Sequence, residues 1–403
     1  MKYDFTSILD RKGKDAIAVA PEEDPYGIAP KGDIKEGFDL IPMWVADMNF
    51  PTSPAICEAV IERAKHPAFG YFDLRPEYYD SIIRWHEKRN GVKGLEKKHI
   101  GYQNGVLGGV LSALRVLCSD GENVLVHAPT YVGFLEEVGR VGYHLIPSEL
   151  KKDTDGIWRM DYEDMDAKIK KYHIHTAIFC SPHNPTGRVW EREELEKAFA
   201  VFEANDVYVA ADEIWSDLIL DGHTHIPSQS VSDDARNRTV ALYAPSKTFN
   251  LAGLVGSYHI IYNDYLRARI ERESSLTVYN APNVLSMYAL IGGYKEESEE
   301  WLEELRLVLS ENLHFAVDFT KANFKGVDVS MPQGTYMLLL DCGEWLKAHD
   351  QTIDELLRKG VEVGVLWQDG RQFNRPDAIR MNLALPNARV REAFQRLKEY
   401  AFI

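Results

Sequence analysis

The stretch Ala-Pro-Ser-Lys-Thr-Phe-Asn-Leu-Ala-Gly-Leu occupies residues 244–254 and directly follows Thr-Val-Ala-Leu-Tyr at residues 239–243. The apolar run predicts a strand, so Lys247 lies just past the strand's C-terminal end. Open α/β sheets build their sites at that edge. A desolvated lysine amine shifts its pKa readily and forms Schiff bases. Since most lysines are solvated surface charges, the interpretation of Lys247 depends on two further motifs upstream.

Two upstream strands are predicted to end in polar motifs in the same way. Residues 176–180 lead into Ser-Pro-His-Asn-Pro-Thr-Gly, which contains Asn184, and residues 207–211 lead into Asp212. Strands are also predicted at 123–127, 143–146 and 257–262, and helices at 135–138, 191–205 and, after a Tyr-Gln-Asn-Gly turn, 105–118. Strands that alternate with helices predict βαβ units and a mainly parallel sheet.

The chain is predicted to form two domains, because 403 residues exceed what one small core accommodates. Residues 50–295 form the large domain, which opens with predicted helices at 54–65 and 76–90. Residues 296–403 form a smaller α+β domain, with predicted helices at 301–323, 352–359 and 388–400 and predicted strands at 334–341, 361–366 and 379–385. The irregular residues 1–49 are expected to pack with this smaller domain.

The bulk composition argues against several functional classes. A net charge of −16 disfavours a nucleic-acid or anionic-membrane surface, because either requires a basic patch. No apolar run approaches the ~20 residues of a membrane span. The N-terminal residues lack the apolar core of a secretion signal. Four cysteines in apolar runs, without metal-ligand spacing, predict buried free thiols, no metal site and a cytoplasmic location; they are Cys57, Cys118, Cys180 and Cys342.

Lys247, Asp212 and Asn184 together match one ligand, an aldehyde cofactor with a pyridine ring and a phosphate. The lysine would form the imine, the aspartate would keep the ring nitrogen protonated, and the asparagine would donate to the phenolic oxygen. The phosphate would suit the free N–H groups that begin the helix at 105–118, those of Gly105, Val106 and Leu107. The ring of Tyr131 could stack on the pyridine face.

Each of these residues also has a purely structural interpretation. Asn-Pro-Thr-Gly is a common turn, Asp212 could be a helix N-cap, and Tyr131 could be an ordinary half-buried aromatic. Unrelated turns would rarely supply three parts of one cofactor site in order along the chain. Their co-occurrence therefore favours the cofactor site.

Three motifs resemble those of fold-type I pyridoxal-phosphate enzymes, the aminotransferase class I/II superfamily: Ser-Pro-His-Asn-Pro-Thr-Gly (181–187), Ala-Asp-Glu-Ile (211–214) and Ser-Lys-Thr-Phe-Asn (246–250). Further stretches are similar to the cystathionine β-lyase branch of cysteine–sulfur lyases: Pro-Met-Trp-Val-Ala-Asp-Met-Asn-Phe (42–50), Phe-Gly-Tyr (69–71), Trp-His (85–86) and His-Ile-Pro (225–227). The resemblance implies an α/β fold in which a large domain with a mainly parallel seven-stranded sheet carries a smaller α+β domain. It also implies a homodimer with shared active sites.

The resemblance also implies a role for each matching residue. Lys247 binds pyridoxal 5'-phosphate as an imine and then acts as the catalytic base, while Asp212 holds the pyridinium and Asn184 the phenolic oxygen. Tyr71 would reach the phosphate of the neighbouring subunit, and Arg380 would bind the substrate α-carboxylate through its bidentate guanidinium. Tyr71 could instead be a core tyrosine and Arg380 an edge charge.

The sequence departs from the superfamily pattern around the lysine and the aspartate. Ala244 and Val255 stand where many members carry a serine and an arginine on the phosphate, so the phosphate would rely on the helix N-terminus, Ser246 and the Tyr71 of the neighbouring subunit. Trp215 stands where relatives often carry Tyr or His, and its indole only donates a hydrogen bond. Asp47 belongs to a loop over the substrate, where it either binds substrate or, as we favour, holds loop backbone.

The leading functional prediction is a carbon–sulfur β-lyase that acts on cystathionine, cysteine or a cysteine conjugate and releases pyruvate, ammonia and a thiol. An aminotransferase is the alternative, because both reactions share every residue until the fate of the Cα proton is decided. A regulatory protein that retains the cofactor site is a third possibility. The sequence does not identify the amino-acid side chain or the leaving thiol.

Overall fold

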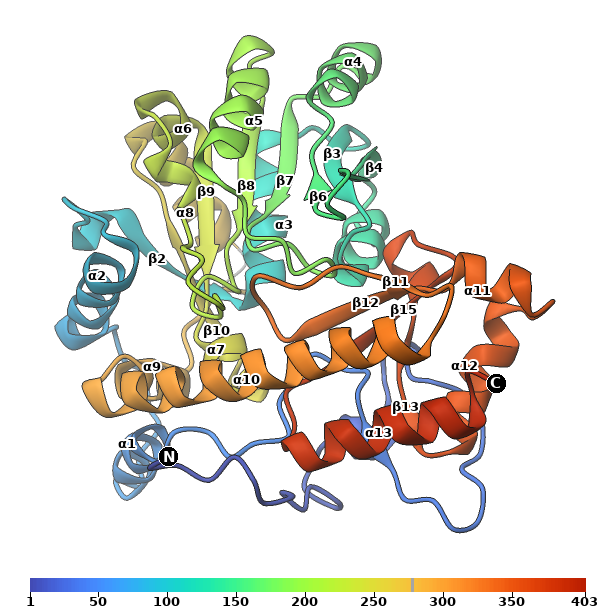
Figure 1. Ribbon diagram of the computed structural model, residues 1–403. Helices are drawn as coiled ribbons and strands as arrows, with labels where there is room; N and C mark the ends of the chain where they lie inside the picture. Colours follow the sequence, from blue (N-terminus) through green and yellow to red (C-terminus); the bar gives the residue numbers. More distant parts are fainter. Residues whose placement is uncertain (277–278) are drawn as a thin grey trace.

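The computed structural model describes residues 1–276 and 279–403, and its centre is a mixed seven-stranded sheet (Figure 1). The strand order is β2-β10-β9-β8-β7-β3-β4. All neighbours pair in parallel except β10, which is antiparallel to both β9 and β2. The strands are β2 (Ile100–Asn104), β3 (Asn123–Ala128), β4 (His144–Glu149), β7 (Thr176–Cys180), β8 (Tyr208–Asp212), β9 (Thr239–Tyr243) and β10 (Gly256–Ile260). The predicted mainly parallel sheet of seven strands is confirmed.

The central strands are buried on both faces, as parallel strands are when helices cover them. Alternate residues enter two separate cores: Phe179 of β7 lies in one and Ile178 in the other. Helix α3 (Gly105–Leu117) covers the second face, and α5 (Arg192–Ala204) packs its Phe199 against Phe179 on the first. The sheet is therefore rigidly enclosed, and its C-terminal edge is the place where a site can form.

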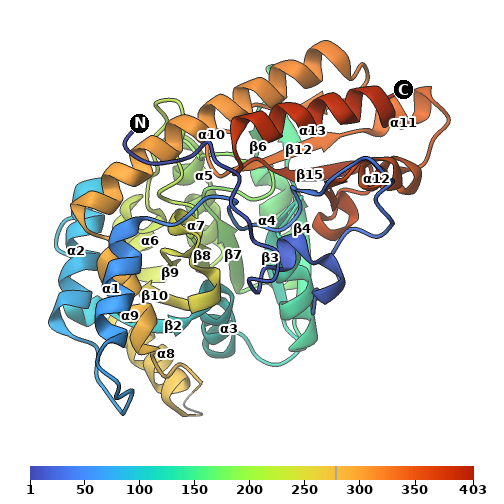
Figure 2. The ribbon, with the colours of Figure 1, turned by 90° about the horizontal axis from the view of Figure 1, so that it is seen from below.

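A four-stranded antiparallel sheet, in the order β11-β12-β15-β14, lies beyond that edge. Its strands are β11 (Asp328–Val329), β12 (Met337–Asp341), β14 (Gln368–Asp369) and β15 (Ala378–Asn382). The long helix α10 (Glu296–Asn323) runs past both sheets, and α13 (Asn387–Tyr400) packs beside it (Figure 2). Strand β1 (Ile41–Pro42) pairs in parallel with β13 (Val365–Leu366). The N-terminal segment is thereby joined to the C-terminal part of the chain, although the predicted domain limits stay predictions.

The other elements cover the outside of these layers. The helices are α1 (Pro54–Ala64), α2 (Pro76–Asn90), α4 (Tyr162–Tyr172), α6 (Asp233–Arg238), α7 (Ser246–Phe249), α8 (Asp264–Leu276), α9 (Val284–Gly293), α11 (Gly343–Ala348) and α12 (Ile353–Glu362). The strands β5 (Lys151–Lys152) and β6 (Trp158–Arg159) pair with each other.

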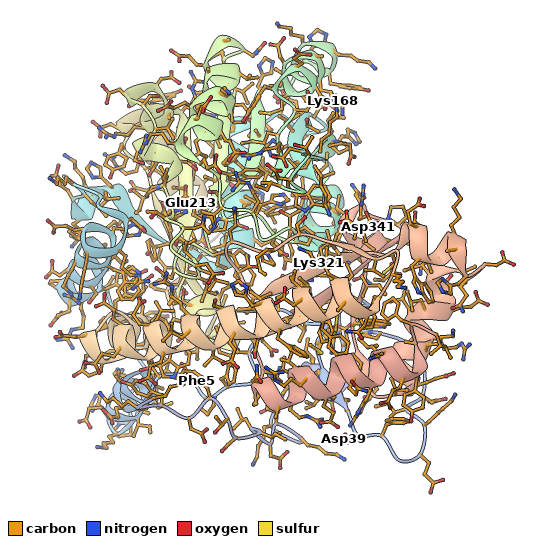
Figure 3. The ribbon with its side chains drawn as sticks, viewed as in Figure 1. Phe5, Asp39, Lys168, Glu213, Lys321 and Asp341 are labelled. Atoms are coloured by element: carbon orange, nitrogen blue, oxygen red, sulfur yellow. The ribbon has the colours of Figure 1, made fainter. Side chains whose placement is uncertain are left out.

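Phe5 lies near α10, where its ring contacts Trp301 at a centroid distance of 5.4 Å (Figure 3). No helix in residues 1–276 and 279–403 is long and apolar enough to cross a membrane.

The structure corrects several boundaries. The predicted Tyr-Gln-Asn-Gly turn is wrong, because residues 102–104 end strand β2 and only Gly105 begins the helix. Polar Gln103 concealed this strand, yet it is fully buried and hydrogen-bonds His259 and Ser112. The predicted strand 361–366 is also wrong at its start, since Val361 belongs to the buried face of helix α12. Helix α10 begins at Glu296 rather than at residue 301.

The four cysteines are free thiols, as predicted, but they are not all buried. Cys180 and Cys342 are buried, and Cys118 is half-buried. Cys57 is exposed, because it lies on the outer face of α1 while Ile56 turns inward. An apolar run in the sequence was insufficient to tell the two faces of that helix apart.

Asn312 connects α10 to the chain that follows β15. It is fully buried, and its side-chain Nδ2 donates to the carbonyls of Leu383 and Leu385 at 2.9 and 2.8 Å. Its Oδ1 accepts from Asn387 at 2.9 Å. A buried carbonyl that loses its donor carries a desolvation cost, so this side chain fixes the small sheet to the long helix.

Replacement of Asn312 by Leu should lower the free energy of unfolding by about 2 kcal/mol, because a buried carbonyl is left without a donor. Urea-induced unfolding monitored by circular dichroism measures this loss. The matched control is Leu307→Ala on the same helix, whose side chain is 66% exposed and which should change stability by less than about 0.5 kcal/mol. Equal effects of the two variants would contradict the role assigned to Asn312.

Candidate active site

A cavity of about 190 Å³ lies at the C-terminal ends of β7, β8 and β9. Figure 1 shows α7, which follows β9, at this end of the sheet and next to α10. Nine of the residues predicted for the site line the cavity together: Gly105, Val106, Leu107, Tyr131, Asn184, Asp212, Ser246, Lys247 and, as a departure from the family pattern, Val255. The topology thus brings together residues from five separate stretches of sequence.

Lys247 lies in the short helix α7, and its amine points to the loop that follows β1. The Nζ atom donates to the carbonyl oxygen of Ala46 at 2.7 Å. The pKa of Lys247 falls to about 8, chiefly because of burial; the Asp47 and Asp212 charges oppose this shift, and the Arg380 cation adds to it. The neutral, nucleophilic fraction of the amine at neutral pH is therefore much larger than for a solvated lysine.

The loop 44–50 supplies backbone acceptors to several of the site's side chains. Arg380 donates to the carbonyl of Trp44 at 3.1 Å, Lys247 to that of Ala46, and Tyr336 also to that of Ala46 at 3.1 Å. Asn250 fixes Met48 from both sides, by accepting from its N–H and donating to its carbonyl, each at 2.9 Å. The position of this loop therefore sets the position of the amine.

Asp212 ends strand β8 and is 5% exposed. Its Oδ1 accepts from the N–H of Ile214 at 3.1 Å. Burial raises the pKa of the Asp212 carboxyl to about 6, against the opposing effects of this N–H and of the Lys247 charge. A carboxylate desolvated to this degree, at the wall of a cavity, is a strong acceptor for a cationic N–H group of a ligand.

Arg380, in strand β15, is 2% exposed and reaches across to Asn184, whose Oδ1 accepts from Nη1 at 3.1 Å. Its Nη2 also donates to Gln368, and its guanidinium lies over the ring of Phe373 at 4.4 Å. The Nε atom is buried without a hydrogen-bond partner among the described residues. A buried guanidinium that no carboxylate neutralises is suited to an anionic group of a ligand.

The N-terminus of α3 forms another wall of the cavity. Gly105 begins the helix at a φ of +75°, where only glycine is unstrained, and the first N–H groups have no acceptor within the helix. Val255 lies beside it at a φ of +64°, a strained conformation for a β-branched residue. Val255 therefore adds an apolar methyl surface here, while Ala244 is buried in the second core.

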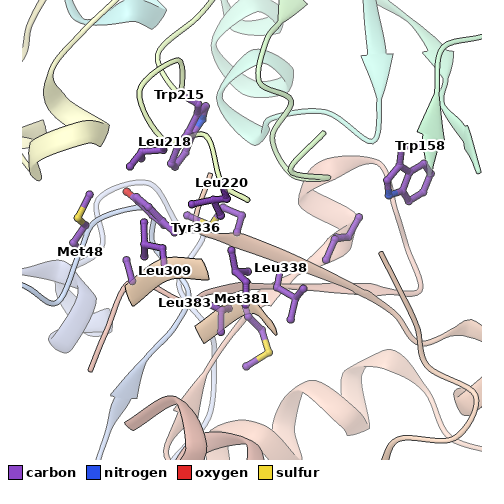
Figure 4. Close-up of a cluster of buried hydrophobic side chains, with 14 of the residues drawn as sticks. Met48, Trp158, Trp215, Leu218, Leu220, Leu309, Tyr336, Leu338, Met381 and Leu383 are labelled. Carbon is purple, nitrogen blue, oxygen red and sulfur yellow. The ribbon is translucent and has the colours of Figure 1, made fainter. Parts of the chain in front are cut away.

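Trp215 lines the cavity and packs against Tyr336, which precedes strand β12 of the small sheet. The two rings meet edge to face at a centroid distance of 4.8 Å, and Figure 4 shows them near Met48. The Lys247 amine lies 5.9 Å from the centre of the Trp215 ring. Tyr336 was missed in the sequence, as was Gln368; Gly-Thr-Tyr at the start of a predicted strand was the only available signal for Tyr336.

Three predicted residues, Arg380, Asp47 and Tyr71, are not among the described residues that line this cavity. Asp47 forms an ion pair with Arg11, which also donates to the carbonyl of Met48 at 3.2 Å and to Asn49 at 3.1 Å. This arrangement agrees with the interpretation that Asp47 holds the loop. Tyr71 is fully exposed in the segment between α1 and α2, so its proposed role needs a second chain.

A family model described as aminotransferase class I and II matches residues 39–397. The chain belongs to this family. It is 32% identical over 363 residues to the cystathionine beta-lyase PatB of Bacillus subtilis (strain 168), a match that covers 89% of this chain and 92% of that protein. It is 30% identical over 399 residues to protein MalY of Escherichia coli (strain K12), which covers 96% of each.

Among solved structures, the PLP-bound C-S lyase from Staphylococcus hominis matches this chain with a TM-score of 0.88 at 28% identity. The match covers 100% of this chain and 99% of that one. The predicted fold type I is therefore confirmed for this family member.

The pKa of Lys247 yields a direct prediction for the cofactor-free protein. Labelling of Lys247 by limiting acetic anhydride, followed by peptide mass spectrometry, should rise with pH through a midpoint near 8, because only the neutral amine reacts and burial disfavours the charged form. Asp47→Asn should move the midpoint lower, since the Asp47 charge raises the pKa of Lys247. A midpoint near the ordinary 10.5 would show that the amine is not desolvated.

Proposed function

We propose that this protein is a pyridoxal 5'-phosphate-dependent C–S β-lyase that cleaves cystathionine or another S-substituted cysteine. The observation that carries the proposal is the pairing, in one cavity, of a desolvated amine at Lys247 with a desolvated carboxylate at Asp212. Relatives named as cystathionine beta-lyase and C-S lyase, similar over nearly the whole chain, support the reaction type.

The residues present fit this cofactor. The buried carboxylate of Asp212 would hold the protonated ring nitrogen, and Asn184 would bond the phenolic oxygen. The ring of Tyr131 lines the same cavity and would stack on the cofactor ring. The phosphate would occupy the N-terminus of α3, whose unpaired N–H groups and positive dipole end favour an anion, with Ser246 beside it. Val255 supplies no charge at this point, so backbone groups would provide most of the affinity.

The side chains have distinct tasks once a substrate is bound. The cofactor supplies an aldehyde for the substrate amine and a ring that accepts the electron pair of the broken Cα–H bond. Arg380 would bind the α-carboxylate, because its guanidinium is buried and cationic and has no carboxylate partner in the part of the chain that the structure describes. Lys247, neutral near pH 8, would take the Cα proton as general base. Asp212 would remain ionised beside the positive ring nitrogen, because a cation at hydrogen-bond distance lowers a carboxyl pKa.

The Cβ–S bond breaks with its electron pair on sulfur, and the thiolate takes a proton. Lys247 is the group positioned to return that proton, since its amine lies at the junction of the cavity and the loop 44–50. Water then completes the reaction, and the products are a thiol, pyruvate and ammonium. The aminotransferase alternative would use the same residues and is less supported by the named relatives, as is a regulatory protein that retains the site.

The purified holoenzyme should release pyruvate and free thiol from L-cystathionine without any added 2-oxo acid. Lys247→Ala should reduce this rate by at least about 100-fold, because the general base is lost. Pyruvate is measured with lactate dehydrogenase and thiol with a chromogenic disulfide. Strict dependence on an added 2-oxo acid would contradict the lyase and favour the aminotransferase.

We also propose that the protein is a homodimer in which Tyr71 completes the site of the neighbouring subunit. Tyr71 is fully exposed in this chain and lies close in sequence to two other exposed apolar residues, Ile61 and Phe69. Val255, which lines the cavity, is a further exposed apolar residue, with 49% of its surface accessible. Exposed apolar side chains near the cavity support a contact with a second chain if they gather into one patch.

A complementation experiment tests this arrangement. Tyr71→Phe should weaken cofactor affinity by about tenfold, because a hydrogen bond to a charged phosphate is lost. When Tyr71→Phe and Lys247→Ala chains are unfolded and refolded together, heterodimers should contain one site with both native residues. Lyase activity at limiting cofactor should then exceed that of either variant alone. If Tyr71 acts within its own chain, mixing restores nothing.

A further inference from the structure

A second cavity, of about 250 Å³, adjoins the first. The two share Ala46, Leu107, Tyr131 and Lys247, but only the second is lined by Arg380. Arg380 carries a buried Nε without a hydrogen-bond partner among the described residues. The first cavity thus contains the groups assigned to the cofactor, and the second extends from Lys247 and Arg380 to the molecular surface.

The walls of the second cavity beyond Lys247 and Arg380 are of two kinds. The N-terminal segment contributes apolar surface from Ile17, Tyr26 and Ile28. A single π-helical turn, Phe134–Val138, places Glu136 and Glu137 at the wall. Single π-turns are often retained where they serve a function, because they cost hydrogen-bond geometry. A substrate whose α-carboxylate and Cα are held at Arg380 and Lys247 would extend its side chain between these walls.

Glu136 and Glu137 form an acidic wall of the cavity, and this wall carries a net negative charge. Glu136 and Glu137 share one cation, Arg140, at 3.5 and 2.8 Å, so two carboxylates face a single guanidinium. The side chain of Arg140 is 59% exposed, whereas those of Glu136 and Glu137 are 32% and 33% exposed. The cations that line the same cavity, Lys247 and Arg380, lie at its inner end. The cavity is therefore positive where the α-carboxylate binds and negative toward its mouth.

We propose that this second cavity binds the sulfur substituent of the substrate and selects substituents that end in a primary ammonium group. The proposal rests on the lyase function and specifies its substrate class as S-aminoalkyl cysteines. In the reaction, the Cα–H bond breaks with the proton passing to Lys247, and the Cβ–S bond breaks with the electron pair on sulfur. The S-aminoalkyl cysteine and one water molecule give an aminoalkyl thiol, pyruvate and ammonium, and the reaction needs no oxidant.

Binding is the primary readout, because thiols of different acidity also leave at different rates. Lys247→Ala holoenzyme binds conjugates without turnover, and calorimetry compares three of them: S-(2-aminoethyl)-, S-propyl- and S-(2-carboxyethyl)-L-cysteine. The aminoethyl conjugate should bind about fivefold more tightly than its neutral propyl isostere, the size expected for a partly exposed ion pair. The carboxyethyl conjugate should bind more weakly than the propyl one. Raising the salt concentration about tenfold, to 0.5 M, should reduce both differences, because it shortens the Debye length about threefold.

Variants of the acidic wall should change this preference in opposite directions. Glu136→Gln and Glu137→Gln, each in the Lys247→Ala background, should bring the aminoethyl-to-propyl ratio toward one, while Arg140→Gln should increase it by releasing both carboxylates. Glu193→Gln is the matched control, because Glu193 lies on α5 and pairs with Lys197 at 2.8 Å. This control should leave the ratio unchanged.

The two proposals fail separately. An aminoethyl-to-propyl binding ratio of one in Lys247→Ala, or a ratio that the combined Glu136→Gln and Glu137→Gln changes leave intact in that background, overturns the assignment of the cavity. Absence of pyruvate from all three conjugates with the wild-type enzyme contradicts the lyase function, whatever the binding ratio. Pyruvate release from S-propyl-L-cysteine without any charge preference in binding retains the lyase and rejects the acidic wall as a specificity determinant.

Discussion

The desolvation of one amine, that of Lys247, is the constraint on which the rest of the site depends. An amine removed from water must find an acceptor or lose its proton, and here both occur: the carbonyl of Ala46 accepts from it, and its pKa falls to about 8. A carboxylate at hydrogen-bond distance would have kept the lysine charged and inert. Asp212 and Asp47 act only through longer-range charge, which limits the shift without abolishing it.

The carbonyl of Ala46, which accepts from Lys247, belongs to a loop rather than to the sheet, and many contacts hold this loop in place. Asn250 from the large sheet's side, Tyr336 and Arg380 from the small sheet's side, and Arg11 from the N-terminal segment all bond to residues 44–50. Each bond is ordinary, but the loop is restrained from three directions. A backbone carbonyl on such a loop is as well positioned as a side chain on a strand.

The sequence was sufficient for the parts of the site that follow buried strands. Apolar runs ending at Asn184, Asp212 and Lys247 are local signals, and the sheet order converts three local signals into one cavity. Contacts between distant segments had no such signal. Arg380 donates to Gln368, and Tyr336 donates to the carbonyl of Ala46. Both contacts depend on how the small sheet approaches the loop, and the hydrophobic periodicity of the sequence carries no information about that approach. Strand β2 was hidden for a related reason, since its polar Gln103 is satisfied by partners far along the chain.

The hydrogen bond between Arg380 and the carbonyl of Trp44 joins residues separated by 336 positions. The ribosome synthesises the chain from its N-terminus, and domains generally fold in that order during synthesis. Loop 44–50 is made long before Arg380, its partner in strand β15. A nascent chain that has not yet reached β15 therefore lacks this restraint on the loop and this cation of the site. Synthesis of β15 and assembly of the site are coupled.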